Sequence, residues 1–152
     1  MSEVRLTYPC DMSLAYLGDS WQDHRDRPGY LAQGWEPGQD FISRSGKPDL
    51  FAVLPGKVIR DKDSGYNDGF GVYCDIDHGV QADGHRYRSL HAHMYRNLVR
   101  VGQVVKAGEK IGVMGTSGNS SCIHDHFILW VDGVNVDPMP YLTGAPIVTP
   151  PP

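Results

Sequence analysis

Turn-forming residues divide this chain into many short segments. The 152 residues include 18 glycines and 11 prolines, with little helical periodicity between them. Runs with strand character lie at 51–60, 71–77, 87–94, 111–114 and 126–131, and the first contains a turn at Pro55-Gly56. Asp132-Gly133 is a turn dipeptide that predicts a hairpin into 134–136. Many short strands joined by frequent turns favour an all-β fold with a mostly antiparallel sheet or sandwich.

The length and the ends of the chain define its expected organisation. A chain of this size has room for one domain with a core, and too little for two. We expect an irregular N-terminal segment at 1–30, one domain at 31–143, and a Pro-rich extended tail at 144–152. The tail ends in consecutive prolines, which cannot donate hydrogen bonds to a sheet.

Composition excludes several classes of function. The net charge is −4 and no basic block stands out, so nucleic acid is not the expected partner. No run approaches the ~20 apolar residues that span a bilayer, and the first residues lack the apolar stretch of a signal peptide. Three cysteines are an odd number, which argues against a disulfide framework and favours buried or half-buried thiols.

Two groups of residues carry possible metal chemistry. His124 and His126 are two apart on a predicted strand, so both imidazoles point to one face. Alone, this pair also fits two half-exposed histidines on a strand edge. Glu36 and Asp40 flank a Pro-Gly turn, and two carboxylates that converge repel each other unless a cation or proton lies between them. With His93 on a further strand, these are the donor types that zinc accepts.

These motifs resemble the lysostaphin-type zinc endopeptidases. That family carries His-x-x-x-Asp in a loop, a further His on a strand, and His-x-His near the C-terminus. The stretch 36–41 (EPGQDF) is similar to the family's His-Pro-Gly-x-Asp-Phe, and the family-like blocks follow in order from about residue 33 to 142. They include residues 77–79, 90–94, 101–112, 115–118, 132–133 and 136–138.

The resemblance implies a fold, an activity and a site. The implied fold is a two-sheet, mostly antiparallel sandwich, and the implied activity is zinc-dependent cleavage of peptidoglycan stem or cross-bridge peptides. Asp40 and His126 would bind zinc. Glu36 either supplies the third ligand, which we favour because zinc accepts Glu, or marks a metal site that is dead. His93 and His124 would act in catalysis, by taking a proton from the attacking water and stabilising the oxyanion.

Three departures from the family pattern bear on activity. Glu36 stands where the family has its first histidine ligand, Cys122-Ile123 replaces Gly-Pro, and Asp125 replaces an apolar residue. A zinc ion held by two carboxylates and one histidine is a weaker Lewis acid, which predicts activity at alkaline pH or very little activity. Asp125 must face away from its neighbouring histidines, so we expect an Arg or a backbone amide as its partner.

Two histidines outside the motifs have simpler interpretations. His24 is expected to be a solvated loop residue, although the irregular N-terminal segment could carry it to the site. His91 is two residues from His93 on the predicted strand, so the two side chains should share a face and His91 should line the groove.

Two other functional classes compete with the peptidase. A degenerate relative could bind the cell wall, or serve as a structural or regulatory component, without cutting. Residues 101–112 also resemble the hairpin of biotinyl and lipoyl carrier domains, but Lys106 and Lys110 are not at a hairpin tip. Because no signal peptide is evident, the expected setting is a phage lysin or a virion-associated protein, with peptidoglycan and other virion proteins as partners.

Overall fold

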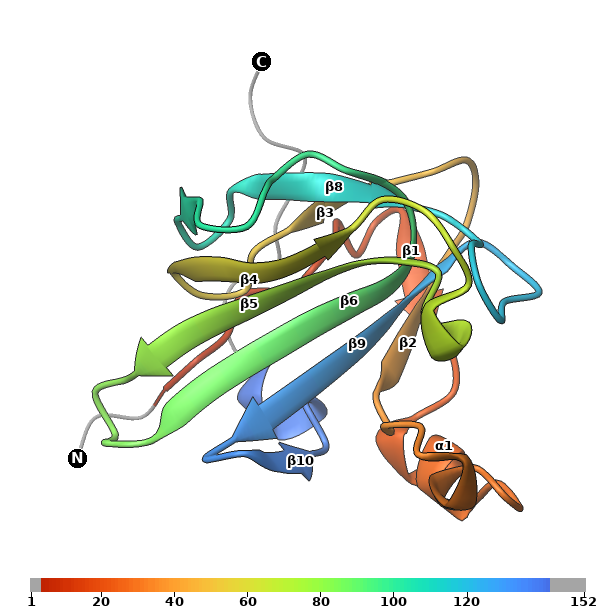
Figure 1. Cartoon of the computed structure of the whole chain (residues 1–152), viewed down its shortest axis with the longest axis horizontal. Helices are drawn as coiled ribbons and strands as arrows, with labels where there is room; N and C mark the ends of the chain where they lie inside the picture. Colours follow the sequence, from red (N-terminus) through yellow and green to blue (C-terminus); the bar gives the residue numbers. More distant parts are fainter. Residues whose placement is uncertain (1–3, 143–152) are drawn as a thin grey trace.

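Ten antiparallel strands form one hydrogen-bonded network in the computed structural model, which describes residues 4–142. The main order is β1-β2-β9-β6-β5-β4-β7, with β10 paired to β9 and the pair β3–β8 joined through β6 (Figure 1). The all-β antiparallel fold class is therefore confirmed. The strands are β1 (Ala15–Leu17), β2 (Gln39–Ser43), β3 (Asp49–Phe51), β4 (Gly56–Lys62), β5 (Val72–Val80), β6 (Arg86–Asn97), β7 (Val104–Val105), β8 (Lys110–Met114), β9 (His124–Val131) and β10 (Val134–Val136).

The long central strands β5, β6 and β9 separate two apolar layers. One layer is the main core, which includes Phe41, Ile76, Met94 and Phe127. The opposite face of the same strands carries a smaller buried cluster of Tyr73, Leu90, Ala92, Ile128 and Trp130. Side chains alternate between the two layers because successive residues of a strand point to opposite faces. We call the second layer the outer face.

The strands predicted from the sequence are present, except that one predicted run is divided into two strands. The run at 51–60 is two strands, because β3 ends at Phe51 and β4 begins at Gly56. The Asp132-Gly133 turn joins β9 to β10, as expected, and both of its residues have positive φ.

The segment expected to be irregular contains two regular elements. β1 pairs with β2 at the edge of the sheet, and α1 (Trp21–Asp26) is a helix of six residues. Ser20 caps α1 through a reciprocal capping box with Asp23, which satisfies two backbone N–H groups at its start. Three short 3-10 turns are η1 (Leu31–Gln33), η2 (Asn67–Gly69) and η3 (Met139–Tyr141).

The remaining expectations about the chain divide into three outcomes. Among the described helices, none is long and apolar enough to cross a membrane. Cys10 and Cys74 are buried free thiols, whereas Cys122 is exposed, contrary to the expectation of a packed thiol. The predicted tail at 144–152 lies outside the described residues.

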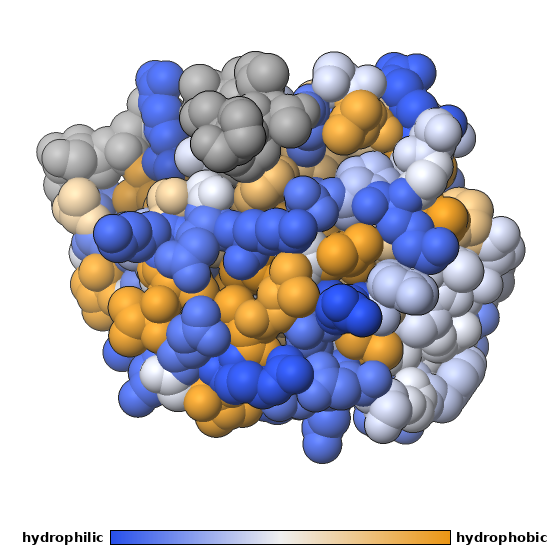
Figure 2. Space-filling view, turned by 90° about the horizontal axis from the view of Figure 1, so that it is seen from above, coloured by the Kyte–Doolittle hydropathy of each residue, from blue (hydrophilic) through white to orange (hydrophobic). Residues whose placement is uncertain are grey.

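On the surface shown in Figure 2, hydrophobic residues form groups that hydrophilic residues interrupt.

Candidate metal centre

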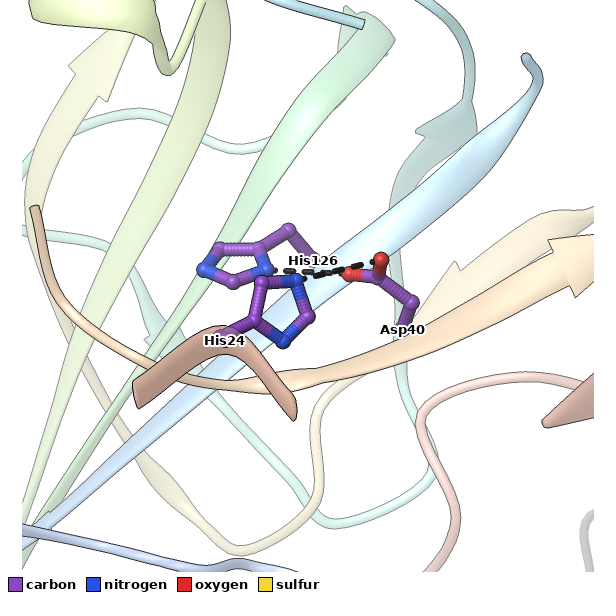
Figure 3. Close-up of side chains that lie close together, drawn as sticks. All are labelled: His24, Asp40 and His126. Atoms are coloured by element: carbon purple, nitrogen blue, oxygen red, sulfur yellow. Dashed lines mark hydrogen bonds and ion pairs between the residues drawn. The ribbon is translucent and has the colours of Figure 1, made fainter. Parts of the chain in front are cut away.

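Three side chains from distant parts of the chain converge on one point. His24 comes from α1, Asp40 from β2 and His126 from β9 (Figure 3). Their potential ligand atoms all lie within 4.8 Å of one another. His126 Nδ1 is 3.0 Å from Asp40 Oδ1, and His24 Nε2 is 3.2 Å from Asp40 Oδ2. Asp40 and His126 are direct partners in the β2–β9 register, so strand pairing alone positions two of the three residues.

The outer ring nitrogens of both histidines are anchored to backbone carbonyls. His24 Nδ1 is 2.8 Å from the Ser20 carbonyl, and His126 Nε2 is 2.9 Å from the Glu36 carbonyl. A carbonyl only accepts, so each outer nitrogen carries a proton, and the inner nitrogen of a neutral ring presents its lone pair to Asp40. This is the arrangement of metal-binding histidines, whose second nitrogen is held by a carbonyl or carboxylate.

A proton or a metal ion is therefore needed between these groups. Two lone pairs facing a carboxylate repel it unless a proton or metal ion lies between them. Burial favours the neutral form of Asp40, but the hydrogen bonds that His126 and His24 donate when each ring carries a second proton hold the pKa of Asp40 well below its usual range. Burial alone would lower the pKa of His24, but the contact with Asp40 outweighs it and raises that pKa. Two imidazole nitrogens, one carboxylate and an open side form the donor set of a catalytic zinc site.

Helix α1 is held in place by contacts on both of its sides. Trp21 Nε1 donates to Asn135 Oδ1 at 2.7 Å, and Asn135 Nδ2 donates to the Pro37 carbonyl at 2.9 Å. The His24 ring packs edge-on against the His126 ring, with 4.6 Å between centroids. His24 is only 4% exposed. The expectation of a solvated loop histidine is wrong, because α1 turns this side chain into the protein.

Glu36 takes a different place from the one its sequence position suggested. Its backbone carbonyl accepts from His126 and also from the Tyr30 hydroxyl, at 3.1 Å. Within residues 4–142, the group of potential metal ligands consists of His24, Asp40 and His126, and Glu36 is not a member. The Glu36 charge instead acts on Arg88, whose pKa is raised first by hydrogen bonds to Asp75 and further by nearby carboxylates, Glu36 among them. The structure thus places His24, rather than the Glu36 carboxylate, beside Asp40 and His126.

His93 and His124 lie on the open side of the triad. Their ring centroids are 4.7 Å apart, and the His93 ring is 6.0 Å from that of His126. His93 Nδ1 is 2.8 Å from the Ser117 carbonyl, so it donates there and leaves Nε2 as the basic nitrogen. His124 Nδ1 is 2.9 Å from the Cys122 carbonyl, which fixes that ring in the same way. Burial and the neighbouring histidines lower the pKa of His93 to about 3, so it is neutral at physiological pH.

A single left-handed residue brings His93 to this face. His93 has a φ of 60°, which is uncommon for a residue other than glycine. The strand alternation shifts at this point, so Ala92 and His93 both lie on the outer-face side while Met94 returns to the main core. His91 consequently points into the core and is fully buried. The expectation that His91 lines the groove beside His93 is wrong.

Asp125 has a partner of an unexpected type. Its Oδ2 atom is 3.0 Å from His91 Nδ1, and both side chains are fully buried. His91 Nε2 and Asp125 Oδ1 have no hydrogen-bond partner among the described residues. The expected Arg or backbone amide is therefore replaced by a histidine from the neighbouring strand β6.

The five polar side chains open into one pocket of about 400 Å³. The pocket confirms the expected convergence of Asp40, His93, His124 and His126. Cys122 lies on its wall, with Sγ 3.8 Å from His124 Nδ1. Other lining residues come from the four connections β1–α1, α1–β2, β4–β5 and β8–β9 and include Asp19, Arg27, Trp35, Asp68, Phe70 and Asn119.

Comparison with known proteins places this site in context. The sequence model of Peptidase family M23 matches residues 35–138, so His24 lies outside the matched segment. Lysostaphin from Staphylococcus simulans is 33% identical over 116 residues, which are 74% of this chain and 22% of lysostaphin. The murein hydrolase activator NlpD of Escherichia coli is 33% identical over 111 residues, which are 73% of this chain and 27% of NlpD.

The solved structures agree with the sequence matches. A zinc-containing peptidase from Vibrio cholerae superimposes with a TM-score of 0.70 at 26% identity, covering 95% of this chain and 41% of that one. The chain spans only about a fifth to a quarter of the two curated relatives.

Proposed function

Because the chain belongs to Peptidase family M23, we propose that it is a zinc-dependent endopeptidase that cleaves stem or cross-bridge peptides of bacterial peptidoglycan. The observation that carries the proposal is the convergence of His24 Nε2, the Asp40 carboxylate and His126 Nδ1. The names of the relatives support the substrate class, since they include lysostaphin and peptidoglycan DD-endopeptidases of Vibrio cholerae.

His24, Asp40 and His126 would hold the metal. When bound, zinc polarises the scissile carbonyl and acidifies a water molecule. One carboxylate and two neutral histidines leave one positive charge on the centre, whereas two carboxylates would cancel it. The alkaline optimum expected from a Glu36 ligand is therefore replaced by activity near neutral pH.

His93 and His124 would act on the substrate from the open side of the pocket. His93 Nδ1 donates to the Ser117 carbonyl, so His93 Nε2 carries the lone pair and would take the proton of the attacking water. His124 Nε2 lies 3.8 Å from Asp40 Oδ1; because Nδ1 already donates to the Cys122 carbonyl, the imidazolium form of His124 would be the one that donates from Nε2 to the oxyanion. Both rings are held by backbone carbonyls, so little reorganisation is needed during the reaction.

Digestion of purified peptidoglycan tests the proposal. The protein is loaded with one equivalent of zinc and incubated with cell-wall sacculi, and released fragments are identified by mass spectrometry. We expect new peptide ends that disappear on chelation and return with added zinc. A protein that holds zinc but releases no peptide from walls of either the direct or the bridged cross-link type would overturn the assignment.

A second candidate is a relative that binds peptidoglycan and regulates its hydrolysis without cutting. It is favoured by the non-histidine residue at position 36 and by the identity to the Escherichia coli murein hydrolase activator. Such a protein would bind walls and would have no need for a metal. Metal content after purification in zinc-containing buffer separates the two candidates. The phage-lysin or virion-associated setting, with other virion proteins as partners, stays a prediction.

A further inference from the structure

Two arginines share one buried carboxylate on the outer face of the sheet. Asp75 of β5 is 0% exposed and lies between Arg60 of β4 and Arg88 of β6. Arg60 Nε and Nη2 contact Asp75 Oδ2 at 2.8 and 2.7 Å. Arg88 Nε contacts Oδ1 at 2.9 Å, and its Nη2 contacts Oδ2 at 3.0 Å. One bidentate arginine would neutralise this carboxylate, so the second guanidinium leaves a surplus positive charge.

The surplus charge is accessible and rigidly oriented. The side chains of Arg60 and Arg88 are 47% and 34% exposed. Arg88 Cζ lies 4.0 Å from the centroid of the Trp130 ring, and Arg60 stacks over Tyr73 at 5.3 Å. Neither Nη1 group donates to another protein atom within residues 4–142. Stacked guanidiniums with free N–H groups are suited to a planar anion such as a carboxylate.

Apart from Asp75, no acidic side chain among the described residues forms an ion pair with Arg60 or Arg88. Asp77, the next acidic residue of β5 on this face, is bound by Arg86 at 2.7 Å. Glu36 acts on Arg88 through space, and the described residues contain no ion pair between the two. The pair of Arg60 and Arg88 is therefore open to an external ligand.

The arginines lie on the same face as the metal triad. Ala92 pairs with His126, Leu90 with Ile128, and Arg88 with Trp130, so β6 and β9 run in step from the triad to Arg88. Arg60 of β4 pairs with Asp75, which pairs with Leu90, so Arg60 lies at the level of Leu90. Trp130 is four residues after His126 on β9, or about 13 Å along the strand. Leu90 and Ile128 form an apolar floor between the two places. In Figure 1, β4, β5, β6 and β9 lie side by side.

We propose that Arg60 and Arg88 form a subsite for a free carboxylate of the substrate peptide, about four extended residues from the bond that is cut. The spacing follows because an extended peptide rises by about 3.3 Å per residue, as the strand beneath it does. The identification of the ligand as a wall peptide rests on the proposed function. The subsite would favour a peptide with a free carboxylate over the same peptide with a carboxamide. The two groups have nearly the same shape, so the preference would depend on their charge.

Binding of two matched peptides by zinc-free protein tests the subsite separately from catalysis. The peptides are cell-wall peptides identical except for a carboxylate or a carboxamide at the proposed position, and Kd is measured by calorimetry at low ionic strength. We expect the acid to bind about tenfold more tightly than the amide, since the charge-assisted contacts are partly exposed. Arg88→Gln should reduce the ratio to near one, whereas the remote Arg100→Gln should leave it unchanged.

Two further variants test the subsite even if Arg88→Gln does not fold. Arg60→Gln removes the more exposed guanidinium, and the remaining arginine still pairs with Asp75. Asp75→Asn keeps the shape of the side chain but adds net positive charge, so it should widen the preference for the acid. Thermal unfolding of each variant is measured in parallel.

Every outcome separates the subsite from the enzymatic proposal. A wild-type ratio near one, or a tenfold ratio that survives both arginine variants, overturns the subsite. Wild-type protein that binds neither peptide overturns it as well. Zinc-loaded protein is tested for cleavage of the same peptides: discrimination in binding without cleavage supports the subsite and counts against the endopeptidase. If zinc-loaded protein cleaves both peptides with equal KM, and zinc-free protein binds both equally, the result supports the endopeptidase and overturns the subsite.

Discussion

Replacement of His24 is the most direct test of the proposed metal centre. His24→Ala removes one of three ligand atoms and one anchored imidazole, while Asp40 and His126 keep their register in the sheet. Loss of partners that merely orient a ligand lowers metal affinity by about 10–100-fold. Loss of the ligand itself should therefore lower zinc affinity by more than ~100-fold, because only one carboxylate and one imidazole remain.

Two companion variants separate ligation from packing. His24→Phe keeps a ring against the rings of His126 and Tyr30 but has no nitrogen, so it should lose zinc as His24→Ala does. Glu36→Gln removes the carboxylate but retains the backbone carbonyl that holds His126, so its zinc affinity should stay within about threefold of wild type.

Helix α1 gives a graded version of the same experiment. Ser20→Ala removes the side-chain cap of α1, which is worth about 1 kcal/mol, and leaves the backbone carbonyl that accepts from His24. If binding depends on α1 being formed, zinc affinity should fall by about fivefold. Ser20→Asn retains a capping side chain and should restore most of the affinity.

Zinc affinities are measured by competition with a chromogenic chelator near neutral pH, and far-ultraviolet circular dichroism confirms that each variant is folded. The assignment of His24 as a zinc ligand is refuted if both His24 variants bind zinc like wild type and Glu36→Gln loses zinc. The Glu36 carboxylate would then be the third ligand, as the sequence pattern had suggested, and α1 would have to sit elsewhere in the metal-bound protein.

Three further predictions concern the surroundings of the site. His93→Ala and His124→Ala should retain zinc but slow wall digestion by roughly 10²–10⁴-fold, and wild-type rates in both would exclude them as proton carriers. His91→Phe should destabilise the fold by about 3 kcal/mol in urea unfolding, because it leaves a buried Asp125 without its partner, and a second change, Asp125→Leu, should recover most of that loss. His78 has a pKa lowered from 6.5 to about 4, chiefly by burial, so the unfolded chain binds more protons between these values. The stability that its neutral form provides is complete above about pH 6.5 and falls by about 3 kcal/mol towards pH 4, a loss that His78→Gln should reduce.

The sequence predicted the strands and most of the pocket for clear physical reasons. Short alternating runs and Gly/Pro turns are local signals, so the strands emerged close to their true bounds. The placement of Asp40 beside His126 depends on pairing between strands 86 residues apart. Strand periodicity cannot supply that pairing, and here it came from the order of the family-like motifs.

His24 and His91 could not be placed from local pattern. His24 depends on how α1 packs against the loop at 36–38, and a contact between Trp21 and Asn135 across most of the chain decides that packing. The available local signal was the capping box at Ser20, which marks a helix that carries His24. His91 depends on the left-handed backbone of His93. Alternation assumes extended residues throughout, and one residue with positive φ reverses the faces on one side of it.

The proposed exchange of ligands, with His24 as the second histidine, gives a reason why Glu36 need not mark a dead site. With His24 in the group, the donor set is again two imidazole nitrogens and one carboxylate oxygen, and the charge on the centre is again positive. Position 36 retains the backbone carbonyl that orients His126. In the proposed arrangement one ligand would belong to a helix of six residues, which is too short to be stable alone. Metal binding and the packing of α1 must then stabilise each other, because a ligand that binds only the ordered form shifts the equilibrium towards it.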